Sequence, residues 1–403
     1  MLLVYYLLLL NIAAFFLYQI DKKKAEFDKW RVSESTLILV AVLGGALGAW
    51  IAMKVFHHKT KKKKFSITVP VFICVWLLIC IFSIYQNFHL VVTYYGYSLG
   101  ESRVVKNGSE GNAESDSDTG SSDTALRIVQ ISDLHNQFFG YKEKSLLGRI
   151  QKLNPDIIVV TGDVVDFTHT NYTLAEDFFE GAVKIAPTYY ITGNHEEYLK
   201  GDRLNEFITE IQKMGVTFLD DKTVQINDGK CNITLAGVAE ESLNDLLEDK
   251  DIFATNKDGA AEEDVTAEDV SDDTPETSSD KTSDNQSDNT SDNTSDNTSD
   301  NTLDNQSDNA SVKILLAHEP EHFEAFSKTG ADIVMTGHVH GGQIIIPGKG
   351  GLLSPDFKFF PKHYEGFYAC DDTDIIISRG LGNSVVPVRI NNYPEIVVLD
   401  ISE

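Results

Sequence analysis

The stretch Thr336-Gly337-His338-Val339-His340-Gly341-Gly342-Gln343 decides the fold, and it directly follows the apolar run Ile333-Val334-Met335. Two histidines one residue apart at the end of a strand can send both imidazoles into one pocket only if the backbone turns there. The flanking glycines permit that turn. Taken alone, the pair is equally compatible with two surface histidines in a glycine-rich loop, so residues elsewhere in the chain must decide.

Strand and helix patterns alternate from Ala125 onward, and polar residues follow the apolar strands. Open α/β sheets build their sites at the carboxyl ends of strands, so these side chains are expected to meet. The candidate metal ligands at strand ends are Asp133, His135, Asp163, Asn194, His318, His338 and His340. Each alone could be a helix cap, a turn residue or a core histidine, but their joint placement favours a site.

The residue types in this set indicate the cofactor. Carboxylate, imidazole and amide oxygen without thiolate suit Mn, Fe, Zn or Mg at a hydrolytic site. An odd number of ligands with one central Asp suits two divalent metal ions that share that carboxylate.

Composition restricts the partners. The chain has 403 residues, 42% of them hydrophobic, and a formal net charge of −27. This charge argues against nucleic acid as a partner, because phosphate backbones are bound by excess Lys and Arg. No obligate protein partner is indicated by the sequence.

An acidic segment over residues 241–310 interrupts the α/β pattern and ends in a Ser-Asp-Asn repeat. Such a composition cannot bury a core, so a disordered low-complexity insert is predicted. It divides the α/β part into residues 125–240 and 311–403, the part that carries the candidate ligands and would be catalytic. A solvated spacer is the first interpretation, and weak binding of cations or wall polymers is the second.

Three apolar stretches precede the catalytic part: Leu2–Ile20, Leu37–Phe56 and Ile67–Tyr85. Each is about long enough to cross ~30 Å of hydrocarbon as a helix. Residues 1–90 are therefore predicted to form a multi-pass membrane domain with two or three transmembrane helices. Residues 91–124 are predicted to be a flexible linker, because residues 100–124 have too little apolar content to pack.

Basic loops predict the orientation in the cell membrane. Residues 57–64 are purely cationic, so the positive-inside rule places them in the cytoplasm and the catalytic part outside. The loop after Asp21 is also basic, and both loops cannot lie inside if the middle stretch crosses the membrane. Either that loop is an exception, or Gly44-Gly45-Ala46-Leu47-Gly48 belongs to a re-entrant or tightly packed segment.

Two resemblances extend this interpretation. Over about residues 4–85, Asp21-Lys22, Gly44-Gly45 and His58-Lys59 are part of a pattern that resembles a small bacterial membrane domain of unknown function. In the catalytic part the motifs Asp133-x-His135, Gly162-Asp163, Gly193-Asn194-His195-Glu196, His318 and Gly337-His338-x-His340 resemble the five motifs of calcineurin-like metallophosphoesterases. The residues around Gly341–Gln343, Ser378–Gly382 and Pro394–Ile396 are similar to the membrane-anchored branch, some members of which cleave lipid-linked phosphate, including UDP-diacylglucosamine.

The second resemblance implies an α/β fold with two mixed β-sheets in an α/β/β/α sandwich. It implies that metal one binds Asp133, His135, Asp163 and His340, and that metal two binds Asp163, Asn194, His318 and His338. Asp163 would bridge the ions, and a hydroxide between them would attack a phosphoester or pyrophosphate bond of a lipid-linked or nucleotide-linked substrate. His195 would be the unligated acid or oxyanion donor, and Arg379 a phosphate contact.

Two other functions remain to be weighed. The chain could be a non-catalytic surface protein with a structural metal site and a cation- or wall-binding insert. Alternatively, the membrane domain could be a transporter or lipid handler with an accessory esterase. The complete ligand set and the unligated His195 weigh against a purely structural site.

Overall fold

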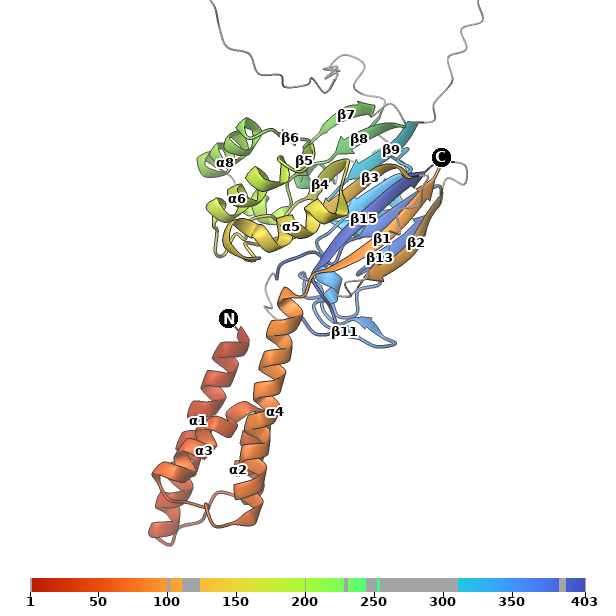
Figure 1. The fold of residues 1–403 in the computed structure, drawn as a ribbon. Helices are drawn as coiled ribbons and strands as arrows, with labels where there is room; N and C mark the ends of the chain where they lie inside the picture. Colours follow the sequence, from red (N-terminus) through yellow and green to blue (C-terminus); the bar gives the residue numbers. More distant parts are fainter. Residues whose placement is uncertain are drawn as a thin grey trace, which may run out of the picture.

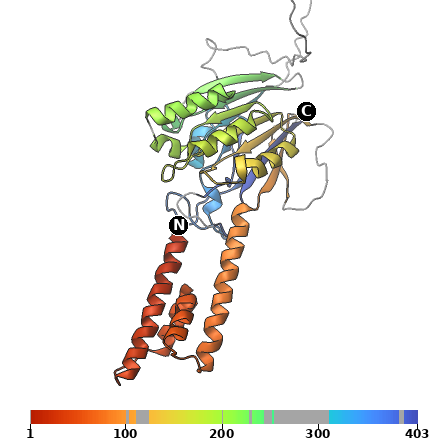
Figure 2. The same ribbon diagram turned by 60° about the vertical axis from the view of Figure 1, so that its left-hand side comes forward.

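The computed structural model describes residues 2–99, 103–110, 124–199, 201–227, 231–243, 252–253, 311–383 and 389–402. Figure 1 shows a globular part built on two β-sheets above a bundle of N-terminal helices. The N-terminus lies at the end of the bundle that faces the globular part (Figure 2).

The first sheet has the strand order β2-β1-β15-β3-β4-β5-β6. From β3 to β6 neighbouring strands are parallel, whereas β15 is antiparallel to β3. The strands are β1 (Val91–Ser98), β2 (Arg103–Glu110), β3 (Thr124–Ile131), β4 (Ile157–Thr161), β5 (Thr188–Ile191), β6 (Val216–Phe218) and β15 (Glu395–Ser402).

The second sheet has the order β13-β14-β10-β9-β8-β7. Its inner strands β14, β10, β9 and β8 are parallel, and the two edge strands are antiparallel to their neighbours. The strands are β7 (Lys222–Asn227), β8 (Asn232–Gly237), β9 (Ser311–Leu316), β10 (Ile333–Thr336), β13 (Gly366–Cys370) and β14 (Thr373–Ile377). β11 (Ile345–Ile346) and β12 (Gly350–Gly351) form a separate two-stranded ribbon.

Both faces of each sheet are covered by packed apolar side chains. Ile128 and Val159 of the first sheet share a core with Ile314 and Met335 of the second. Helices α5 (Lys144–Leu153), α6 (Tyr172–Ala182) and α8 (Asp202–Lys213) cover the outer face of the first sheet (Figure 1), and the short α9 (Phe323–Phe326) packs on the second. The predicted α/β sandwich of two mixed sheets is confirmed.

The predicted linker over residues 91–124 contains two strands. β1 pairs in parallel with β15, and β2 pairs with β1, so both extend the first sheet. Val92 and Tyr95 of β1 are buried. The linker prediction was therefore wrong for Val91–Ser98 and Arg103–Glu110, because apolar residues of β1 gain their partner only from the distant β15.

Within the predicted insert over residues 241–310 the structure describes only residues 241–243 and 252–253. Leu243 is buried, and Ile252 and Phe253 pack against the core of the second sheet. The remainder of the insert, including residues 254–310, lies outside the described residues.

The N-terminal part contains α1 (Leu2–Glu26), α2 (Glu34–Val40), a π-helical turn (Ala41–Gly45), α3 (Ala46–Val55) and α4 (Lys63–Phe88). Within the described residues, two segments, Glu34–Val55 and Lys63–Phe88, are long and apolar enough to cross a membrane. By length and composition alone these two segments are only a weak argument for membrane association.

The segment Glu34–Val55 does not run straight. A continuous helix of 22 residues would be ~33 Å long. Yet Glu34, at its start, lies 3.5 Å from Lys59 and 2.5 Å from Lys62, which both follow its end. Gly44, with φ of 128°, reverses the chain between α2 and α3. This geometry favours the re-entrant alternative and puts both basic loops at one end of the bundle.

The helical bundle is joined directly to the first sheet. Only His89 and Leu90 separate α4 from β1. The Gln86 side-chain oxygen accepts a hydrogen bond from the Asn391 N–H at 2.9 Å, and the Val91 N–H donates to the Pro394 carbonyl at 2.9 Å. The globular part is thus fixed to the end of α4.

Candidate metal centre

Five strands deliver the predicted ligands to one place. The loops after β3, β4 and β5 come from the first sheet, and those after β9 and β10 come from the second. The carboxyl ends of these parallel strands meet between the sheets, and the structure brings all seven predicted ligands together there.

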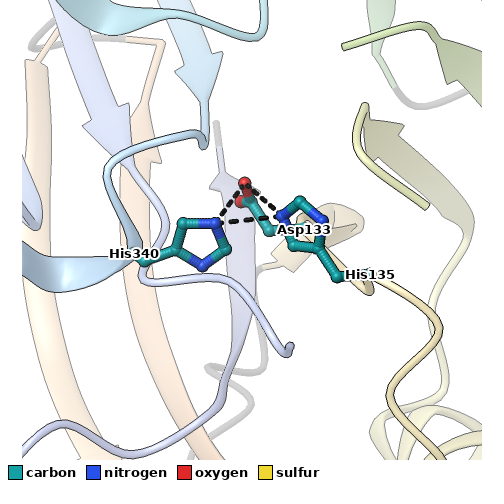
Figure 3. A group of neighbouring side chains, drawn as sticks. All are labelled: Asp133, His135 and His340. Atoms are coloured by element: carbon teal, nitrogen blue, oxygen red, sulfur yellow. Dashed lines mark hydrogen bonds and ion pairs between the residues drawn. The ribbon is translucent and has the colours of Figure 1, made fainter. Parts of the chain in front are cut away.

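The first group of ligand atoms comes from Asp133, His135 and His340 (Figure 3). The Nε2 atoms of His135 and His340 lie 3.0 Å apart, and Asp133 Oδ1 lies 3.5 Å from His340 Nε2. All three side chains are buried. The three donor atoms therefore face a common point that could hold a metal ion.

The second group comes from Asp163, His318 and His338. His318 Nε2 lies 3.2 Å from Asp163 Oδ2 and 3.3 Å from His338 Nδ1. Asn194 Oδ1 adds a fourth donor atom, 3.1 Å from His318 Nε2 and 3.3 Å from His338 Nδ1. His318 Nδ1 donates to the Thr161 carbonyl at 2.8 Å, which leaves the Nε2 lone pair facing the group.

Asp163 lies between the two groups. Its Oδ2 atom is 3.4 Å from His135 Nε2 and 3.2 Å from His318 Nε2. One carboxylate thus reaches ligands of both groups.

The ligand loops are strained. Asp133, His135, Asp163, His338 and His340 have φ between 44° and 67°, in the left-handed region that non-glycine residues seldom adopt. Each such residue costs about 1 kcal/mol or more, which the surrounding structure must offset. Hydrogen bonds between loops do so. The Asp133 N–H donates to the Gly162 carbonyl at 3.1 Å, and the His338 N–H to Asp133 Oδ1 at 3.0 Å.

Glu196 holds the loop that carries Asp163. Its fully buried carboxylate accepts hydrogen bonds from the N–H groups of Asp163, Val165 and Gly193 at 2.8 to 3.0 Å. Burial raises the pKa of Glu196 to about 7. Glu196 therefore has a structural role, because it fixes the backbone of the loop that carries Asp163.

Charge and protonation in the two groups suit divalent cations. Burial lowers the pKa of His135 to about 3 and that of His340 well below its usual range, so both imidazoles are neutral, the form that binds metals. Burial also acts to lower the pKa of His318, but the Asp163 carboxylate raises it well above its usual range. The carboxylate thus attracts positive charge to the position that a metal ion would fill, and the donor set fits the expected ions.

His195 lies at the edge of the first group, with its ring centroid 4.4 Å from that of His135. Its Nδ1 atom accepts a hydrogen bond from the Phe167 N–H at 3.3 Å, so the proton of the neutral ring is on Nε2. Asp166 Oδ2 lies 3.8 Å from Nδ1 of both His195 and His135. The sequence analysis missed Asp166, although it stands three residues after Asp163, within the same strand-end loop.

Two arginines lie near the metal centre, of which only Arg379 was expected there as a phosphate contact. Arg379 is ion-paired with Glu395 at 2.8 Å and with Glu365 at 3.3 Å. The fully buried Arg389 instead lies 3.4 Å from His340 Nδ1, and its guanidinium donates to the Gly382 and Arg379 carbonyls. The Asn392 side-chain amide donates to the His340 carbonyl at 2.7 Å. Only tertiary structure brings Arg389 and Asn392 to the ligand, so no sequence signal indicated them.

Residues 126–342 match the family model of the calcineurin-like phosphoesterases, and this match covers more than half of the chain. The chain belongs to this family. It is a metal-dependent phosphoester hydrolase, and the alternative of a non-catalytic surface protein is set aside. Residues 11–65 match a second model, a protein family of unknown function called DUF1294.

Curated relatives match each part separately. The uncharacterized protein YsdA of Bacillus subtilis is 46% identical over 70 residues, which are 17% of this chain and 79% of that protein. The uncharacterized metallophosphoesterase YkuE of the same organism is 26% identical over 278 residues, 68% of this chain and 78% of that protein. The phosphodiesterase YaeI of Escherichia coli is 23% identical over 283 residues, which are 68% of this chain and 82% of that protein.

Proposed function

We propose that the chain is a membrane-anchored phosphodiesterase that works with two divalent metal ions. Metal one would bind Asp133, His135, Asp163 and His340, and metal two would bind Asp163, Asn194, His318 and His338. The observation that carries this proposal is the position of Asp163 Oδ2, within 3.4 Å of one histidine from each group. The two ions would polarise the phosphate and lower the pKa of a bound water.

The chain's own groups would orient the substrate and move a proton. His195 keeps its proton on Nε2 because Nδ1 accepts the Phe167 N–H. Nε2–H is therefore the donor available to a phosphate oxygen or to the leaving oxygen. Asp166 Oδ2, 3.8 Å from Nδ1, would help to keep the ring in this orientation.

The substrate that we propose is a phosphodiester or pyrophosphate linked to a lipid or a nucleotide, on the outer side of the cell membrane. α1 and α4 would cross the bilayer, and the segment between them would re-enter it. Both basic loops lie at the bundle end away from the globular part, marked by the Asp21 ion pairs with Arg31 and Lys59. The positive-inside rule then places the globular part outside the cytoplasm.

Metal removal and replacement test this function on the full-length protein in detergent. Exhaustive chelation should abolish hydrolysis of a nitrophenyl phosphodiester, and Mn, Fe, Zn or Mg should restore it. Two metal equivalents should bind the wild type, whereas Asp163→Asn should lose both metal and activity. Asp202→Asn, an exposed carboxylate of α8, is the matched control. Full activity in a verified metal-free sample, or wild-type metal content in Asp163→Asn, would overturn the proposal.

A further inference from the structure

We infer that the segment Gln343–Tyr364, termed the aromatic loop, docks into the headgroup region of the same bilayer that α1 and α4 cross. It would hold the metal centre against lipid phosphates. This inference rests on the proposed membrane-anchored function and adds a second membrane contact next to the site.

Exposed aromatic side chains mark this surface. Phe357, Phe359 and Phe360 are 63%, 72% and 48% exposed. Clustered exposed phenylalanines are unfavourable in water and indicate an interaction site. In the sequence, Lys358 lies between Phe357 and Phe359, and Lys362 lies two residues after Phe360. Aromatic rings beside lysines are typical of segments that sit at an anionic bilayer surface.

The aromatic loop is a hydrogen-bonded unit. The Leu352 N–H donates to the Ile344 carbonyl at 2.8 Å, and the Phe360 N–H to the Leu352 carbonyl at 3.0 Å. The Ser354 N–H donates to the Lys358 carbonyl at 3.0 Å. The phenylalanines are thus presented from an ordered turn, and docking would not require the loop to fold first.

Further hydrogen bonds tie the loop to the end of α4. The Ile345 N–H donates to the Ile390 carbonyl at 3.0 Å, and the next residue, Asn391, donates its N–H to the Gln86 side chain at 2.9 Å. β11, within the loop, lies level with the upper end of α4 in Figure 1. The β11 part of the loop therefore lies beside the end of the helix.

The upper end of α4 would lie at the bilayer surface. α4 has 26 residues and is therefore ~39 Å long, more than the ~30 Å hydrocarbon core. Its polar last turn, with Gln86 and Asn87, reaches the headgroup region when the apolar middle is in hydrocarbon. Because only two residues link α4 to β1, the aromatic loop is held at that level.

The loop also borders the metal centre. Asp356 Oδ2 lies 3.6 Å from His338 Nε2. A cavity of about 230 Å³ lies between His338 and the loop, and its charged lining consists of Lys358 and Lys362 together with Glu321 and Asp356. Lys358 is ion-paired with Glu321 at 2.6 Å, so a headgroup phosphate that enters this cavity would meet Lys362 and would compete with Glu321 for Lys358, beside a ligand of metal two. A bilayer is therefore the occupant that fits both the rings and the cavity.

Spin labelling of the full-length protein tests the docking without any assay of activity. The four cysteines are replaced, and Phe359→Cys carries a nitroxide in vesicles of phosphatidylethanolamine and phosphatidylglycerol. The label should be accessible to oxygen and shielded from a water-soluble nickel chelate. The control is Val105→Cys on β2, 54% exposed, which should give aqueous values. Aqueous values at position 359, or shielding from both reagents as in a protein contact, would overturn the inference.

A kinetic comparison then separates this inference from the function on which it rests. The triple variant Phe357→Ser, Phe359→Ser, Phe360→Ser should hydrolyse a soluble nitrophenyl phosphodiester like the wild type. Its turnover of a phosphodiester lipid in the same vesicles should fall about tenfold or more. If the wild type cleaves neither substrate, the proposed function fails and the label still decides the docking. If the triple variant cleaves both substrates like the wild type, the docking inference is wrong.

Discussion

Replacing His195 with alanine should separate catalysis from metal binding. His195 forms a third cluster with His135 and Asp166, beside the two ligand groups, but its Nδ1 atom is occupied by the Phe167 N–H. Loss of the ring should therefore leave both metal ions bound while removing a proton donor. A general acid contributes about 10²–10⁴ to turnover, or about 3 to 5 kcal/mol of transition-state stabilisation.

The leaving group and two further variants make the test specific. The loss should be smaller for nitrophenolate, which leaves without a proton, than for an alkoxide. His340→Ala should lose metal and activity together, because its Nε2 lies 3.0 Å from that of His135. His169→Ala removes an exposed histidine from the nearby loop and should change neither. The metal content and the kcat on both substrates distinguish these outcomes. If His195→Ala releases metal as readily as His340→Ala, or keeps full turnover on the alkyl ester, the assigned role is wrong.

Three further predictions concern the scaffold. Gly380→Ala should release metal, because Gly380 has φ of 66° and an added Cβ would lie 2.6 Å from the Cβ of Asp133. Gly148→Ala adds a Cβ to open space, so the same metal analysis should show no loss. Burial raises the pKa of Glu143 to about 7, so the folded state favours the protonated carboxyl group and the free energy of unfolding falls as pH rises from about 4.5 to 7. Glu143→Gln should remove this loss of about 3 kcal/mol. The variant should therefore have a higher Tm than the wild type at pH 8 but not at pH 4.5. A Gly/Ser linker in place of residues 254–310 should leave Tm within a few degrees, because Phe253 keeps its core contact; a large drop in Tm would mean that the replaced residues support the fold.

The ligands could be found from the sequence because strand ends are local signals. Asp133, Asp163 and His318 each follow an apolar run within three residues, and parallel strands must bring such positions to one edge. Asp163 has a left-handed backbone directly after Gly162, so glycine marks the turn there. Local pattern and global geometry thus agree at the metal centre.

Other features depended on contacts between distant residues. β1 looks like the end of an apolar helix followed by linker, and it becomes a strand only because β15 pairs with it. Arg389 reaches His340 through the loop around Gly382, which no spacing rule predicts. The reversal at Gly44 remained one of two alternatives until the ion pairs of Glu34 showed both ends of the segment together.

The pairing of β1 with β15 also constrains the order in which the protein folds during synthesis. Val91 pairs with Glu395, so β1 is synthesised long before the strand that it pairs with. Until then β1 has only β2 beside it, and an isolated two-stranded ribbon is marginally stable. The helices would already be inserted while this apolar edge stays unpaired, which is a state open to aggregation or proteolysis. The first sheet is therefore completed only after β15 has been synthesised, and a product truncated before Glu395 should be recognised as unfinished.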